Sequence, residues 1–238
     1  LAMKVPNITP AFWIIKVCCT TVGETFADFL TSGPPQLGVQ IGVGVFGAIL
    51  AASLAVQICL SDYHPFPYWL AVILTSIEGT LITDSLTDDI GVPLWQTTLG
   101  FGLSLLAIFA SWRFTEGTLD VHSIKTLRRE LWYWLTIITT FALGTSLGDL
   151  ISEQIGSFCI AVAVFLAWII FVGILWQTDL RLRLSYFSPI AAFWCTYVLT
   201  RPLGASIGDL LSQDTDVGGL GLGTTVTSGI LLAIIIVL

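Results

Sequence analysis

Hydrophobic residues fall into long stretches along this chain, and polar residues either separate the stretches or recur inside them at helical spacing. Eight stretches are long enough to cross, as helices, the roughly 30 Å of hydrocarbon in a bilayer. The pattern predicts an all-α, polytopic membrane protein with a single transmembrane domain over residues 1–238. The predicted spans are Ala11–Leu30, Leu37–Leu60, Tyr68–Leu86, Val92–Phe114, Leu131–Ile151, Ile155–Gln177, Pro189–Leu211 and Gly219–Leu238.

One polar pattern recurs in the odd-numbered stretches: an aromatic residue, Trp, nine residues, Gly, four residues and Asp. A period of about 55 to 65 residues indicates an internal-repeat protein. The pattern predicts four tandem two-helix repeats, at residues 11–60, 67–114, 131–177 and 189–238. The Trp residues of the pattern are Trp13, Trp69, Trp134 and Trp194, and its Asp residues are Asp28, Asp84, Asp149 and Asp209.

Composition agrees with the membrane prediction. Hydrophobic residues make up 55% of the chain and charged residues 11%, and the mean hydropathy is +0.90. An ordinary soluble domain carries about 25% charged residues. The five cysteines lie in apolar stretches and the two histidines are isolated, which favours neither a disulfide framework nor a histidine metal site. We expect no cleavable signal peptide, no cofactor and no nucleic-acid partner.

Lys and Arg residues predict the orientation. Seven of the nine lie at the N-terminus, at the end of the fourth stretch, or after the fourth and sixth stretches, and none lies in the connections that follow the odd stretches. By the positive-inside rule both termini are cytoplasmic, all four repeats point the same way, and the repeat Asp residues lie in the outer part of the bilayer. The aromatic-Trp pairs then serve as anchors at the inner interface. The seven residues are Lys4, Arg113, Lys125, Arg128, Arg129, Arg181 and Arg183.

Each odd stretch also carries a stripe of residues one helical turn apart, at positions 3, 7, 11 and 15 after its Trp, which share one helix face. Ionisable residues at such depth cost at least about 2.5 to 3.5 kcal/mol each, and they normally face a bundle interior or a wet cavity. Packing alone does not require them. The charged residues, serines and threonines of the four stripes are, repeat by repeat, Lys16, Thr20, Glu24 and Asp28; Ser76, Thr80 and Asp84; Thr145 and Asp149; and Arg201 and Asp209.

The carboxylates of the stripes are candidates for cation or proton binding. Glu24 and Asp28 lie one turn apart, which favours binding of a proton or a cation, and they form our tentative metal site. Each repeat Asp either contacts an ion or substrate or caps the outer end of its helix. Lys16 and Arg201 are interpreted as internal counter-charges, with Lys16 a candidate to balance Glu24. Glu78 lies on a different face, where protonation, a neighbouring helix and an oligomer contact all fit.

The four aromatic-Trp units in tandem two-helix copies resemble an uncharacterised family of bacterial membrane proteins, built from four repeats that each contain two transmembrane segments and a characteristic Trp. The resemblance covers nearly the whole chain. It implies an eight-helix bundle, and with it a multi-pass protein of the bacterial inner membrane. It supplies no substrate and no catalytic residues.

A small-cation transporter or channel, coupled to protons, fits these features best. Acidic outer loops and a set of four Asp side chains would concentrate cations, as charged rings do in cation pathways. Oxygen ligands suit hard divalent ions, and Na⁺ or H⁺ fits nearly as well. The unequal stripes favour one asymmetric site dominated by the first and seventh stretches.

Two other classes of function remain open from the sequence. An intramembrane aspartyl protease would need Gly-x-Gly-Asp, but Ser146 and Ser206 replace the first Gly, so the motif fails and we expect no enzyme. The main alternative is a non-catalytic structural or accessory subunit of a membrane complex. A homo-oligomer, or a partner inside such a complex, fits either reading, and membrane lipid surrounds the protein in both.

Overall fold

The computed structural model describes residues 3–33, 38–182 and 188–238, and in this part of the chain it contains eight α-helices and no strand. Short turns join them, among them a π-helical turn, η1, at Ser85–Asp89 and 3-10 turns at Val121–Ser123 and Thr215–Val217. The helices are α1 (Pro10–Thr31), α2 (Val39–Cys59), α3 (Pro65–Asp84), α4 (Leu94–Glu116), α5 (Leu127–Ile155), α6 (Phe158–Leu182), α7 (Pro189–Ser212) and α8 (Thr224–Val237).

These helices correspond one to one with the eight predicted spans, and most of their ends agree within a few residues. The predicted start at Leu37 and the orientation residue Arg183 lie outside the described residues. Among the described residues, five helices are long and apolar enough to cross a membrane: α2, α3 with η1, α4, α5 and α6. The membrane character of the chain is therefore supported, while the crossing of all eight helices stays a prediction.

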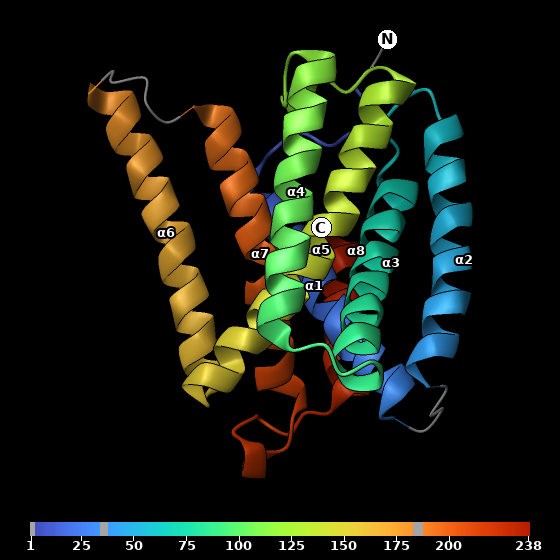
Figure 1. Ribbon diagram of the computed structural model, residues 1–238, viewed down its shortest axis with the longest axis vertical. Coiled ribbons are helices and arrows are strands. Elements are labelled where there is room, and N and C mark those ends of the chain that lie inside the picture. Colours follow the sequence, from blue (N-terminus) through green and yellow to red (C-terminus); the bar gives the residue numbers. More distant parts are fainter. Residues whose placement is uncertain (1–2, 34–37, 183–187) are drawn as a thin grey trace.

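The odd helices begin with strong local signals. Pro10 and Pro189 open α1 and α7, where a missing backbone N–H has no helical partner to lose. The hydroxyls of Thr9 and Ser188 accept hydrogen bonds from the backbone N–H groups of Phe12 and Ala191, at 3.2 and 3.1 Å. These starts fix the register of the polar stripes. Figure 1 shows odd and even helices running in opposite directions, so all four odd helices point the same way.

The four odd helices form a closed inner ring. Helix α1 packs on α3, α3 on α5, α5 on α7, and α7 packs back on α1. The even helices lie outside this ring, and each packs chiefly on the odd helix of the following repeat: α2 on α3, α4 on α5, α6 on α7, and α8 on α1. Successive repeats therefore interlock, and the last repeat closes on the first.

Glycine sets the spacing of this ring at four equivalent crossings. The pattern Gly of each odd helix faces the residue that lies seven positions after the Trp of the next odd helix. A β-carbon on that Gly would overlap this residue or press closely against it. Such close approach of helix backbones needs a residue without a side chain. The four crossings are Gly23 against Ser76, Gly79 against Phe141, Gly144 against Arg201, and Gly204 against Thr20.

Candidate functional site

A buried ion pair lies at the centre of the ring. The Nη2 atom of Arg201 in α7 donates to the Oε2 atom of Glu24 in α1 at 2.7 Å, and the two side chains are almost fully buried. Arg201 also donates to the hydroxyls of Thr80 in α3 and Thr145 in α5. Every odd helix thus contributes one side chain to this cluster, which we call the central cluster: Glu24, Thr80, Thr145 and Arg201.

The central cluster leaves much hydrogen-bonding capacity unused. Three acceptors share the two N–H groups of Arg201 Nη2, whereas Nε and Nη1 of the same guanidinium have no hydrogen-bond partner among the described residues. Arg201 is nevertheless fully buried. Unpaired buried N–H groups are rare in folded proteins, and at a charged side chain they point to a functional role.

The four repeat Asp residues surround the same axis beyond the central cluster. Each side chain is half-buried, near the C-terminal end of its odd helix. They lie near enough to Glu24, and to one another, for their charges to interact. One buried oxygen of Asp28, Oδ2, has no hydrogen-bond partner in the described structure. We call this group the acidic end: Asp28, Asp84, Asp149 and Asp209.

Lys16 lies on the other side of the central cluster, and it does not balance Glu24 as the sequence suggested, because Arg201 pairs with that carboxylate. Its side chain is fully buried, and its Nζ atom has no hydrogen-bond partner among the described residues. The Nζ atom lies 4.2 Å from the ring centre of Phe141 and 4.3 Å from that of Tyr197. Aromatic faces attract an ammonium group at this distance.

Three of the four pattern Trp residues are buried within the bundle, so they are not the lipid-exposed interface anchors that the sequence predicted, whereas Trp13 is partly exposed. Trp69, Trp134 and Trp194 are each less than 10% exposed, and they belong to one aromatic cluster at the N-terminal ends of the odd helices. The hydroxyls of Tyr68 and Tyr133 in this cluster lie 2.5 Å apart. Edge-on contacts between neighbouring rings, such as Tyr68 with Trp69 and Tyr133 with Trp134, stabilise this packing. We call this part the aromatic end.

The remaining predicted residues have different positions. Thr20 and Ser76 join odd helices through backbone carbonyls, with Thr20 Oγ1 donating to Thr200 O at 3.3 Å and Ser76 Oγ to Thr20 O at 3.2 Å. Glu78 points away from the axis toward α2, where a β-carbon on Gly47 would lie 3.1 Å from its Oε1 atom. Its buried Oε2 atom lacks a hydrogen-bond partner in the described chain. Glu78 therefore does not belong to the central cluster.

The described residues include no group of three or more His, Cys, Asp or Glu side chains close enough to hold one metal ion. The pair Glu24 and Asp28 could contribute two carboxylates, but Glu24 Oε2 already accepts bonds from Arg201 and from Thr80, the latter at 3.0 Å. A cation at this place would have to compete with the guanidinium. The central cluster can therefore bind a cation only if the cation displaces the Arg201 guanidinium from the Glu24 carboxylate.

Comparison with known protein families identifies the repeat. The model of a family described as a repeat of unknown function, DUF347, matches residues 11–63, 67–118 and 192–238. These three matches cover more than half of the chain. The chain belongs to this family. Neither the curated proteins nor the solved structures gave a match.

The family matches coincide with the first, second and fourth predicted repeats. The segment of residues 131–177 is not matched, yet it carries the same Trp, Gly and Asp pattern in α5. In the structure α5 occupies the equivalent place in the ring, and its Gly144 makes the equivalent crossing. Helix α5 of the third segment thus occupies a position in the ring equivalent to those of the odd helices in the matched repeats.

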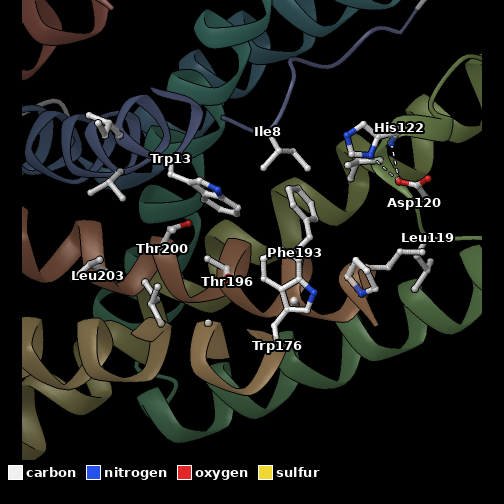
Figure 2. Close-up of a pocket in the computed structure, with 18 of the residues that line it drawn as sticks. Ile8, Trp13, Leu119, Asp120, His122, Trp176, Phe193, Thr196, Thr200 and Leu203 are labelled. Atoms are coloured by element: carbon white, nitrogen blue, oxygen red, sulfur yellow. Dashed lines mark hydrogen bonds and ion pairs between the residues drawn. The ribbon is translucent and has the colours of Figure 1, made fainter. Parts of the chain in front are cut away.

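A second feature of the structure is an apolar groove of about 880 Å³ on the outer side of α1 and α7, beside α6. Figure 2 shows the rings of Trp13, Trp176 and Phe193 on its walls, and Asp120 bonded to His122 at one end. The His122 ring lies 3.0 Å from the Asp120 carboxylate. The groove contains none of the intramembrane carboxylates, so it is separate from the central cluster.

Sequence reasoning missed the roles of Phe141, Tyr197 and the Tyr68–Tyr133 pair. A signal for two of them was present, because Phe141 and Tyr197 occupy stripe positions 7 and 3 after their Trp residues. Their contact with Lys16 depends on how α1, α5 and α7 meet, and that arrangement is a property of the closed ring.

Proposed function

We propose that this protein is a membrane transporter for a small cation, coupled to protons, with its pathway along the axis of the inner ring. The observation that carries the proposal is the buried charge on this axis. Arg201, Glu24, Asp28 and Lys16 come together from α1 and α7, and three of them retain unpaired polar atoms. Since buried ionic groups are costly in a membrane protein, a purely structural ring would be better served by apolar side chains.

The proposed pathway has three zones along the axis. The acidic end attracts and partly dehydrates a cation, as rings of carboxylates do in cation pathways. The central cluster closes the path, because Arg201 occupies Glu24 and repels an approaching positive charge. The aromatic end closes the other half with packed rings. Transport then requires Glu24 to exchange its guanidinium partner for a cation or a proton.

The orientation in this proposal follows the positive-inside rule, which places the acidic end outside and both termini in the cytoplasm of a bacterium. The carboxylate and hydroxyl oxygens of the axis suit Na⁺, Mg²⁺, Ca²⁺ or Mn²⁺. The site is asymmetric, since only α1 and α7 carry charges in the middle of the ring, as expected from the unequal stripes.

A flux assay tests this function. The purified protein is reconstituted in liposomes that contain a pH-sensitive dye and is exposed in turn to Na⁺, K⁺, Mg²⁺, Ca²⁺ and Mn²⁺. We expect one of these cations to drive a proton signal that is lost in the double variant Glu24→Gln, Asp28→Asn. Asp62→Asn removes an exposed carboxylate in the connection between α2 and α3, and it is the matched control that should retain the signal.

If wild type and double variant behave alike with every cation, the transporter proposal fails. The alternative of an accessory subunit would then take its place, and it predicts that the protein purifies with one fixed membrane partner. Purification as a monomer or a homo-oligomer, together with cation-dependent flux, favours the transporter.

A further inference from the structure

Lys16 is a buried charge on the axis to which none of the three zones of the proposed pathway gives a role. It is fully buried, and the carboxylate nearest to it in the stripe is held by Arg201 instead. An ammonium group has three N–H donors, and none of them finds a hydrogen-bond acceptor among the described residues. A counter-charge without a paired anion has no obvious structural value.

The surroundings of Lys16 satisfy neither of its protonation states fully. The faces of Phe141 and Tyr197 attract an ammonium at 4.2 and 4.3 Å. Against this, the missing acceptors and the nearby Arg201 guanidinium disfavour a second positive charge. The guanidinium carbon of Arg201 lies 5.8 Å from the same Phe141 ring, so both cations share one aromatic side chain. A group with such opposed surroundings can exchange a proton with little rearrangement.

The titratable and charged groups near Lys16 come from every helix of the inner ring. Helix α1 itself contributes the Cys19 thiol, and α7 contributes Arg201 and Tyr197. Helices α3 and α5 contribute Tyr68 and Tyr133, whose hydroxyls lie 2.5 Å apart and near enough to Tyr197 for their charges to interact. Within the described part of the chain, no carboxylate is among the groups whose charge affects Lys16.

Tyrosine side chains extend from Lys16 toward the end of the ring where the odd helices begin. The Tyr68 and Tyr133 hydroxyls are hydrogen-bonded to each other, whereas the Tyr197 hydroxyl has no hydrogen-bond partner among the described residues. Tyr197 lies against Lys16, Tyr133 and Tyr68 follow, and the ring of Tyr63, in the connection between α2 and α3, packs edge-on to that of Tyr68 at 5.6 Å. Tyr63 is partly exposed. A hydroxyl can accept one proton while it donates its own, so the Tyr68–Tyr133 pair can pass a proton through packed rings that exclude a hydrated metal ion, and the unpaired Tyr197 hydroxyl must rotate to extend this relay toward Lys16.

We propose that the Lys16 amine is the proton-exchange site on the aromatic side of the central cluster, supplied from the aromatic end, where the Tyr68 and Tyr133 hydroxyls form a hydrogen-bonded relay. The step is a simple protonation: the lone pair of Nζ accepts a proton and an ammonium forms, and the reverse step releases the proton. The added charge repels Arg201, which links proton binding by Lys16 to the Glu24–Arg201 pair. This inference rests on the proposed function for its meaning in transport, but protonation itself is testable without transport.

The chain contains only three lysines, Lys4, Lys16 and Lys125, which makes a direct measurement feasible. Protein labelled with ¹⁵N-lysine in lipid nanodiscs is followed by NMR between pH 5 and pH 10. The variants Lys4→Arg, Lys16→Arg and Lys125→Arg assign the three side-chain signals by their loss. We expect the Lys16 signal to change from ammonium to amine within this pH range.

A Lys16 signal that stays ammonium, or stays amine, over the whole pH range overturns the inference whether or not the protein transports cations. Flux supplies the second test. Lys16→Arg keeps a positive charge but cannot release its proton, so it should abolish cation-driven proton flux, whereas Lys125→Arg should not change it. Cation flux with an unchanged proton signal in Lys16→Arg would overturn the role of Lys16 and leave the transporter proposal standing.

Discussion

The Nη2 atom of Arg201 and the Oε2 atom of Glu24 lie 2.7 Å apart at the centre of the inner ring, although 177 residues separate them in the chain. The pair joins α7 to α1, which is the contact that closes the ring. The ion pair therefore links the first repeat to the last, and it is also the barrier on the proposed pathway.

Removal of one partner of this ion pair should destabilise the protein strongly. Glu24→Gln and Arg201→Gln each leave an unpaired buried charge, and we expect losses of about 3 to 5 kcal/mol in the free energy of unfolding. The double variant should lose less than the sum of the two, because no charge is left unpaired. Thermal unfolding in detergent measures these differences. Arg128→Gln is the control, since the Arg128 side chain is 66% exposed and its ion pair with Glu116 should contribute less than about 1 kcal/mol.

Alanine at a ring crossing should have the opposite effect from alanine on the outer helices. Gly144→Ala places a β-carbon against Arg201 and Pro202, so it should lower the unfolding temperature and disturb the central cluster. Gly173→Ala in α6 meets no atom within 4 Å, and the better helix propensity of Ala should make it neutral or stabilising by up to about 1 kcal/mol. Equal unfolding temperatures for the two variants would contradict the close crossings of the inner ring.

The orientation of the bundle is testable with single cysteines. Ser61 and Asp89 are exposed in connections at opposite ends of α3, and Ser61→Cys and Asp89→Cys are made in a background with the native cysteines changed to Ser. A membrane-impermeant maleimide added to intact cells should label position 89 and leave position 61 unlabelled until the cells are opened. The reverse labelling would place the acidic end in the cytoplasm and reverse the direction of the proposed pathway.

The sequence predicted the helices and the repeat well, because both depend on local patterns. Continuous hydrophobic stretches give each helix, and the spacing from Trp to Gly to Asp gives the repeat in α1, α3, α5 and α7. The stripe argument also selected all four members of the central cluster, since residues one turn apart share a face. Glu24, Thr80 and Thr145 are even equivalent, each eleven positions after its Trp.

The partners of those residues could not be predicted, because they depend on how the helices close into a ring. Lys16 lies two turns before Glu24 in the same stripe, and proximity in sequence made it the natural partner. The closed ring brings Arg201 to Glu24 and leaves Lys16 between two aromatic rings. The same closure buries Trp69 and Trp134, which the sequence alone placed at the membrane interface.

Cation binding to the central cluster tests the central claim most directly. Calorimetric titrations with NaCl and MgCl₂ are made on protein in nanodiscs, for wild type, Glu24→Gln and Arg201→Gln. The account predicts that one of the two cations binds to wild type, that Glu24→Gln weakens this binding at least tenfold, and that Arg201→Gln strengthens it, because the guanidinium no longer competes for the carboxylate. Equal affinities in all three proteins, or no binding in any of them, would contradict a cation pathway through the Glu24–Arg201 pair.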